Sequence, residues 1–417
     1  MEMVPRAATG LIDELASALR VVIVNGPRQS GKTTLLKQYQ RSHGGTYRTL
    51  DDRQMEEAAR SDPVAFTREG DPPRLIDEVH RGGDWLVRAV KTAVDEDPSP
   101  GRFLLSGSSR FLTIPTLSES LAGRAAFVDL WPLSAAERTG GRTDFYDRVF
   151  GDPASLAGDS SWTRTDYLDL ALMGGYPEVV ALSSGVARRA WYDGYLTTIV
   201  NRDISNFAEI DKAHAIPRLL ALLAARTGSP LVLSTLARAA DLSPATARQY
   251  LTYLDVVFLT TAVPAWSANL TAKIAKTPKI YLTDSGLAGH LMRATSAGLR
   301  SPGNPALGPL VETLALTELL KLKTCSGSPV NITQLRDTQG REIDFILEGP
   351  DGRVVAVEIK ATTSPGADSA KHLRWFRDQL GERFSTGLVL HLGTHGTSFG
   401  DRIQALPLSV LWGHAAG

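Results

Sequence analysis

The chain has 417 residues, enough for about two to four domains that each bury a core of their own. Its 45 lysines and arginines balance 45 aspartates and glutamates, so no overall charge attracts nucleic acid or a membrane, and such binding would need local patches. The single cysteine, Cys325, excludes an internal disulfide. The sequence shows no signal-like N-terminus and no apolar run of about 18 residues, which predicts a cytoplasmic protein without a membrane partner.

Residues 1–20 place apolar side chains at helical spacing and predict an amphipathic helix. The next segment, 21–34, opens with four β-branched residues typical of a buried strand. It continues with a loop that matches G-x-x-x-x-G-K-[ST] and runs into a helix, which is the context that a phosphate-binding loop requires. The loop and helix start consist of Gly26, Pro27, Arg28, Gln29, Ser30, Gly31, Lys32, Thr33 and Thr34.

The residue types in this loop predict how it binds a nucleotide. Gly26 and Gly31 let the backbone approach closely, so that amide N–H groups surround the phosphates at a helix N-terminus. Lys32 is expected to reach the β- and γ-phosphates, and Thr33 to offer its hydroxyl to Mg²⁺. The sequence therefore predicts a protein that binds ATP with Mg²⁺.

A second motif follows at residues 74–78, where a short apolar strand runs into Asp77 and Glu78. An aspartate at a strand end can hold the Mg²⁺ shell, and the next glutamate can polarise the attacking water. Acid pairs also occur at strand ends without such a role, but beside a phosphate loop this pair predicts the catalytic acids of ATP hydrolysis.

Two further stretches complete a resemblance. Residues 103–109 predict a buried strand that ends in hydroxyl side chains, and residues 121–124 read Leu-Ala-Gly-Arg. Together with the two motifs above, and with Tyr281–Leu287 and the region from Arg336 to Lys360, they resemble a prokaryotic AAA+ ATPase family. Its members join the ATPase to a winged helix and to a C-terminal domain similar to restriction endonucleases.

The resemblance implies roles for two more residues. Ser108 stands where such ATPases place a polar sensor, usually an asparagine, although Ser108 could equally cap a helix. Arg124 is a candidate arginine finger acting on the phosphate of a neighbouring subunit, or else an ordinary structural arginine.

Residues 216–263 predict three short helices, and Ser243 followed by Pro244 is a strong helix start. The pattern resembles a winged helix-turn-helix whose recognition helix begins at Ser243 and projects Arg248, with Thr246, Gln249 and Tyr250 also able to touch DNA. The segment after it carries Lys273, Lys276 and Lys279, a candidate basic wing. The alternative is a module that contacts protein.

The C-terminal part predicts a β-hairpin with paired acids. A turn centred on Asp351 pairs residues whose numbers sum to 702, which sets Asp344 opposite Glu358 with Cβ atoms about 5 Å apart. Lys360 lies two residues further along and shares that face. Two carboxylates beside a lysine can hold Mg²⁺ against a phosphodiester, unless a bulge shifts the register.

Glu312, Asp344, Glu358 and Lys360 also match the motif of restriction-endonuclease-like domains. This resemblance implies that Asp344 and Glu358 bind metal, that Lys360 steadies the attacking water, and that Glu312 is an auxiliary acid. The alternative is a fold kept as a binding platform. His391 and His395 lack the spacing of metal ligands and are expected in core or surface roles.

The sequence thus predicts an α/β protein with an AAA+ P-loop ATPase (1–135), a helical connector (136–215), a winged helix (216–300) and an endonuclease-like domain (301–417). The first hypothesis is an ATPase that couples nucleotide turnover to DNA engagement, with a candidate nuclease. The others are a nucleotide-switched protein-interaction module with inert acids, and a DNA-binding regulator without cleavage. A homo-oligomer or a protein partner is compatible with each.

Overall fold

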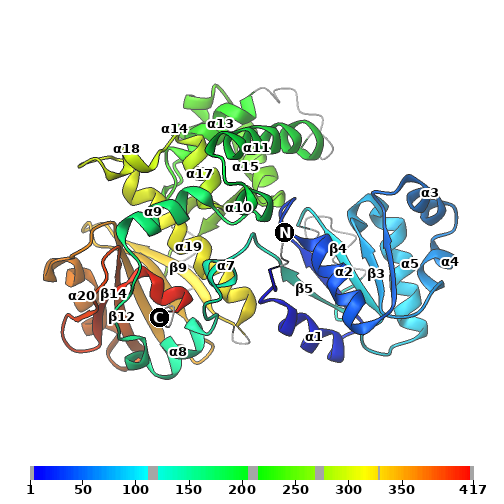
Figure 1. The fold of residues 1–417 in the computed structure, drawn as a ribbon, viewed down its shortest axis with the longest axis horizontal. Coiled ribbons are helices and arrows are strands. Elements are labelled where there is room, and N and C mark those ends of the chain that lie inside the picture. The colour runs from blue at the N-terminus through cyan, green and yellow to red at the C-terminus, as the bar shows by residue number, and fades with distance from the viewer. Residues whose placement is uncertain (1–3, 111–120, 205–214, 268–276, 327–328, 414–417) are drawn as a thin grey trace. The chain divides into compact units, whose positions relative to one another are not determined.

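The computed structural model describes residues 1–417 apart from 1–3, 111–120, 205–214, 268–276, 327–328 and 414–417. The chain divides into two compact units (Figure 1). The smaller unit comprises Pro5–Leu133 with Val256–Phe258, and the larger one contains Ser134–Asp255 and Leu259–Gly417. The three predicted domains after residue 135 fall in the larger unit apart from Val256–Phe258, and the proposed division among them stays a prediction.

The smaller unit is built on a five-stranded sheet in the order β2-β3-β4-β1-β5, with every neighbouring pair parallel. The carboxyl ends of all its strands therefore meet at one edge. The strands are β1 (Val21–Asn25), β2 (Thr46–Thr49), β3 (Arg74–Asp77), β4 (Phe103–Gly107) and β5 (Ala125–Asp129). The helices are α1 (Thr9–Ala18), α2 (Lys32–His43), α3 (Arg53–Ser61), α4 (Pro63–Arg68) and α5 (Gly83–Glu96).

The interior strand β1 is covered on both faces, which explains its unbroken β-branched run. Val22 and Val24 pack with Leu35 of α2, whereas Ile23 faces the other way and packs with Val90 of α5. Figure 1 shows α2 and α5 on opposite sides of the sheet. The predicted parallel α/β core is confirmed.

The larger unit contains a six-stranded sheet in the order β13-β14-β12-β11-β10-β9. Its strands are β9 (Asn331–Arg336), β10 (Glu342–Glu348), β11 (Val354–Lys360), β12 (Phe384–His391), β13 (Thr397–Ser398) and β14 (Ile403–Pro407). The β9–β10–β11 part is antiparallel, and β11, β12 and β14 run parallel. Helix α20 (Lys371–Leu380) covers one face through Leu373 and Phe376 beside β12 and β14 (Figure 1).

The described helices before this sheet in the larger unit have five to 14 residues, apart from α19 (Leu307–Cys325), which has 19 residues and packs on β11. They are α7 (Ala135–Thr139), α8 (Phe145–Gly151), α9 (Arg164–Met173), α10 (Pro177–Ala181), α11 (Gly185–Thr198), α13 (Ala215–Ala224), α14 (Leu233–Ala240), α15 (Pro244–Val256), α17 (Ser285–Leu291) and α18 (Ser296–Arg300). Among the described residues, no helix is both long and apolar enough to cross a bilayer.

A small antiparallel sheet of three strands belongs to the same unit, in the order β6-β8-β7. Its strands are β6 (Ser229–Pro230), β7 (Thr260–Val263) and β8 (Lys279–Leu282). The chain after β7 is hydrogen-bonded to β9, because Gln334 donates to the Pro264 carbonyl at 2.9 Å and Trp266 donates to the Gln334 carbonyl at 2.6 Å. These bonds attach the small sheet to the edge of the large one.

Candidate functional sites

The phosphate loop lies between the end of β1 and the start of α2, at the carboxyl edge of the parallel sheet. Gly31 has a φ of 95°, in the region that favours glycine. A side chain on Gly26 would place its Cβ 2.2 Å from the Leu130 carbonyl oxygen, so only glycine fits there. The two glycines of the motif are therefore required by the path of the backbone.

Lys32 is buried at the start of α2, and its ammonium points back over the loop. It donates to the carbonyl oxygens of Gly26 at 2.9 Å and of Pro27 at 2.8 Å. The positive charge is thus held within the curve of the loop, where a phosphate chain binds in such loops.

Asp77 ends β3 beside this loop and accepts hydrogen bonds from three hydroxyl groups. Thr33 donates to its Oδ2 at 2.6 Å and Tyr47 to the same atom at 3.0 Å, while Ser106 donates to Oδ1. A threonine hydroxyl next to a carboxylate is the oxygen pair that a Mg²⁺ shell uses, so these residues fit the ion. The sequence motifs identified Thr33 and Asp77 but not Tyr47 and Ser106. In the sequence, these two residues stand out only as polar side chains within predicted strands.

Glu78 follows with a left-handed backbone, at φ 55°, which turns the chain directly after the strand. Its Oε2 lies 3.1 Å from Nδ1 of His80. Burial opposes its ionisation, but His80 and the charges of Lys32 and Arg28 outweigh burial and hold the pKa of Glu78 at about 2. Glu78 is therefore an anion at neutral pH.

The two residues implied by resemblance have different surroundings. Ser108 is buried just beyond β4, and the segment that it would cap, 111–120, lies outside the described residues. Arg124 precedes β5 and so lies at the edge of the sheet opposite the phosphate loop. It binds both oxygens of Asp95, at 2.6 and 3.1 Å, as a structural arginine would. Its action on a neighbouring subunit stays a prediction.

In the larger unit, the predicted hairpin register is confirmed, because β10 pairs with β11 from Phe345 opposite Val357 to Glu348 opposite Val354. Register shifts occur on the outer sides of this hairpin, between β10 and β9 and between β11 and β12. Asp344 and Glu358 are next along this hairpin and are both buried, at 8% and 9% exposure.

Lys279 corrects the predicted basic wing. It begins β8, is 1% exposed, and donates to Glu312 at 2.9 Å and to Asp344 at 3.2 Å. Its ammonium also lies 2.8 Å from Oε1 of Glu342. Lys279 therefore cannot contact DNA from this position, because three carboxylates from α19 and β10 surround it inside the unit. Lys273 and Lys276 lie outside the described residues.

Glu312, Glu342 and Asp344 around Lys279 form an acidic centre, and β11 adds Glu358 and Lys360 to it. Lys360 donates to Oε1 of Glu358 at 2.6 Å, and the Ile359 amide donates to Oδ2 of Asp344 at 2.9 Å. Burial, followed by the negative charge of Asp344, raises the pKa of Glu358 to about 8 and that of Glu312 to about 7.

The acidic centre has one feature of a metal site and lacks another. Oε2 of Glu358 is buried without a hydrogen-bond partner among the described residues, as an incomplete ligand would be. However, no group of three or more metal-ligating side chains in the described part of the chain is arranged so that it could hold a metal ion. The acids therefore do not fit a divalent ion while Lys279 occupies their midst.

Helix α15 begins as predicted, with the Ser243 hydroxyl accepting from the Thr246 amide at 3.0 Å. Arg248 and Gln249 are exposed on this helix. Tyr250 is 3% exposed and packs inward, so the expectation that it touches DNA is wrong. Its position along the helix turns it to the core.

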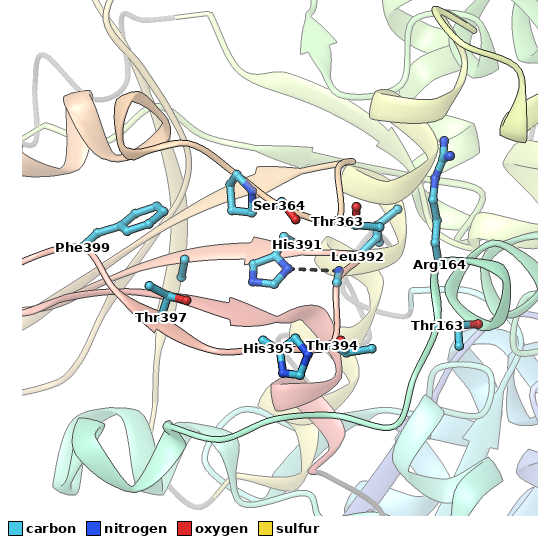
Figure 2. Close-up of a pocket in the computed structure, with 13 residues that line it drawn as sticks. Thr163, Arg164, Thr363, Ser364, His391, Leu392, Thr394, His395, Thr397 and Phe399 are labelled. Atoms are coloured by element: carbon cyan, nitrogen blue, oxygen red, sulfur yellow. Dashed lines mark hydrogen bonds between the residues drawn. The ribbon is translucent and has the colours of Figure 1, made fainter.

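The two C-terminal histidines lie beside a cavity of about 450 Å³ beyond the carboxyl ends of β11 and β12. His391 is buried there and accepts a hydrogen bond from the Gly393 amide at 3.0 Å, drawn in Figure 2 among hydroxyl side chains. Burial lowers the pKa of His391. His395 is exposed and pairs with Asp159 at 2.9 Å. His391 therefore lies in the core and His395 at the surface, in line with the roles expected for them.

Family models match three successive parts of the chain. An AAA domain matches residues 19–139, and two domains of unknown function, DUF8612 and DUF4143, match residues 164–298 and 307–411. The AAA match covers the phosphate loop and the Asp77–Glu78 pair. The protein is a P-loop ATPase, an enzyme that binds and hydrolyses ATP.

Two curated relatives are uncharacterized proteins of Mycobacterium tuberculosis and Mycobacterium bovis, each 30% identical over 388 residues, which cover 93% of this chain and 80% of the relative. The chain belongs to the same family as these mycobacterial proteins. A Walker-type ATPase of Pyrococcus abyssi is a structural neighbour at 13% identity and a TM-score of 0.38, covering 70% of this chain and 96% of that one. This overall likeness is too low to support conclusions about function.

Proposed function

We propose that the protein uses its nucleotide state to control how it engages DNA. The proposal rests on α14 and α15, two helices joined by a short turn. Ser243, just before α15, is exposed, and so are Arg248 and Gln249 on the helix. A helix of this kind can enter a major groove, with its first turns towards base edges and a guanidinium near phosphate or guanine.

The order of elements around this pair supports a winged helix. Helix α13, strand β6, helices α14 and α15, and strands β7 and β8 follow one another as helix, strand, helix, helix, strand, strand. Arg238 on α14 is also exposed and adds a second positive charge to the helix pair. With a formal net charge of zero over the whole chain, DNA affinity would have to come from such a local patch.

At the nucleotide site, we infer that Thr33 and Asp77 would hold a Mg²⁺ ion, which would supply positive charge beside the phosphates. The Lys32 ammonium then leaves the carbonyls of Gly26 and Pro27 for the phosphates. Glu78, ionised at neutral pH, orients the attacking water. A homo-oligomer would let Arg124 reach a second subunit only after its bonds to Asp95 break.

The test is fluorescence anisotropy of labelled duplex, branched and single-stranded DNA, titrated at several salt concentrations with a non-hydrolysable ATP analogue or ADP. We expect Arg248→Ala to weaken binding about tenfold and to reduce the salt slope by about one. Arg300→Ala, which removes an exposed arginine from α18, is the matched control and should change neither. Lys32→Ala should remove the difference between the two nucleotides.

A second candidate is a nucleotide-switched protein-interaction module whose C-terminal acids are inert. The burial of Lys279 among those acids favours it. ATP hydrolysis without measurable DNA binding at low salt, in the same titrations, would refute the first proposal and favour this one.

A further inference from the structure

The acidic centre of the C-terminal domain already contains a cation that belongs to the chain. Lys279 comes from the small three-stranded sheet, and its side chain is 2% exposed. Its Nζ lies within 3.2 Å of one oxygen each from Glu312, Glu342 and Asp344. An ammonium surrounded by three carboxylate oxygens takes up the position in which a divalent ion would bind those oxygens.

We propose that the Lys279 ammonium is the cation that this centre binds. While β8 holds Lys279 among the three carboxylates, the domain then binds no divalent ion there and cleaves no phosphodiester. The inference does not depend on the proposed DNA engagement, because none of its residues lies on α14 or α15.

The oxygens of Asp344 show why a metal and Lys279 exclude one another. Oδ1 accepts from Lys279 and Oδ2 accepts from the Ile359 amide, so both oxygens are engaged within the protein. Divalent ions require oxygen at about 2.0–2.6 Å and repel a neighbouring ammonium. Metal entry would therefore require the Lys279 side chain to leave.

The strand that carries Lys279 is held in place by more than this one side chain. Tyr281, two residues further and on the same face of β8, donates to Oε1 of Glu312 at 2.5 Å. Lys279 itself pairs in register with Val263 of β7 and Pro230 of β6. Gly228 lies against Glu312, where a Cβ would come 3.2 Å from the carboxylate. The lysine thus joins the two sheets as well as neutralising the acids.

The centre contains more carboxyl groups than ammonium groups. Two ammonium groups face four carboxyl groups, namely Lys279 and Lys360 against Glu312, Glu342, Asp344 and Glu358. Removing Lys279 leaves the four carboxyl groups facing the single ammonium of Lys360, and the three oxygens that accepted from Lys279 lose their donor. A hard divalent cation is the ligand that best replaces the lost charge.

The experiment measures Mn²⁺ binding to the full-length protein without nucleotide, by the electron paramagnetic resonance signal of the free ion. Wild type, Asp344→Asn, Lys279→Met, Lys279→Arg and the double variant Lys279→Met/Asp344→Asn are compared. Any binding at the phosphate loop is common to all five and cancels in the comparison.

We expect wild type, Asp344→Asn and Lys279→Arg to give the same isotherm. Lys279→Met should bind one additional Mn²⁺, which the added Asp344→Asn change removes, and Mn²⁺ should raise the melting temperature of Lys279→Met alone. A wild-type protein that loses a bound Mn²⁺ on Asp344→Asn overturns the proposal, as does a folded Lys279→Met variant that gains none. Should Lys279→Met fail to fold, the comparison of wild type with Asp344→Asn still tests the proposal, which requires equal Mn²⁺ binding in the two proteins.

Discussion

At the scale of single residues, the nucleotide site is organised by the hydroxyl groups that converge on Asp77. Thr33, Tyr47 and Ser106 come from α2, β2 and β4, and each donates to the same carboxylate. Such contacts orient a metal-binding carboxylate and set its basicity. Ser106 is the least expected of the three, because it lies in an otherwise apolar buried strand.

Ser106→Ala removes one of these donors without changing the volume of the strand much. We expect turnover of ATP to fall about tenfold and the Mg²⁺ concentration for half-maximal activity to rise, because outer contacts of this kind typically contribute 10- to 100-fold to metal affinity or activity. Steady-state ATPase assays over a Mg²⁺ titration measure both quantities.

Ser109→Ala is the matched control for this prediction. The Ser109 hydroxyl is buried nearby without a hydrogen-bond partner among the described residues, so its loss should leave the Mg²⁺ dependence unchanged. Equal Mg²⁺ dependence in wild type and Ser106→Ala would show that Asp77 does not need this donor.

At the scale of elements, two stretches that are far apart in sequence form one buried junction. Asp284 caps α17 by accepting from the Leu287 amide at 2.9 Å, and it also accepts from the Gly175 amide at 2.8 Å. A Cβ on Gly174 would lie 2.2 Å from Oδ1 of Asp284, so glycine is needed for this approach. Tyr192 of α11 donates to the same carboxylate at 3.3 Å. The stretches Gly174–Pro177 and Thr283–Gly286 therefore have a structural role, because their contacts hold α9, α11 and α17 together.

Asp284→Ala should destabilise the larger unit by on the order of 3 kcal/mol, because it leaves buried amide donors without acceptors. Urea unfolding monitored by circular dichroism measures the loss. Asp193→Ala removes an exposed carboxylate paired with His290 on the neighbouring surface and should cost less than about 1 kcal/mol. Similar losses in the two variants would show that the junction does not depend on Asp284.

At the scale of the whole molecule, the acidic centre makes stability depend on pH. Burial and Asp344 raise the pKa of Glu358 from 4.5 to about 8 in the folded protein. Between these values the folded chain binds protons that the unfolded chain has released. The stabilisation is complete below about pH 4.5 and is lost as the pH rises through about 8, so the free energy of unfolding from this group falls as pH increases.

We therefore expect wild type to lose more than about 1 kcal/mol of unfolding free energy between pH 6 and pH 9 relative to Glu358→Gln. The glutamine keeps the shape of a protonated carboxyl and cannot ionise. Urea titrations at the two pH values provide the measurement, with Glu382→Gln as an exposed control in the same unit. A Glu358→Gln protein with the same pH dependence as wild type would contradict the expectation.

The sequence by itself determined the features that lie close together along the chain. The phosphate loop is a run of consecutive residues whose backbone surrounds the ligand, so its pattern carries its geometry. The helix start at Ser243 and the register of the β10–β11 hairpin follow in the same way, because a short turn leaves the two strands one simple pairing.

Only the tertiary structure decided what surrounds each side chain. Ser106 reaches Asp77 because β4 lies next to β3, and Lys279 meets Glu312 and Asp344 because the small sheet is attached to the large one. Within its own segment, Lys279 has the spacing of an exposed basic residue. Its burial and its charge partners depend on elements that come later in the chain. The residues next to Lys279 in sequence do not indicate which distant carboxylates will surround it.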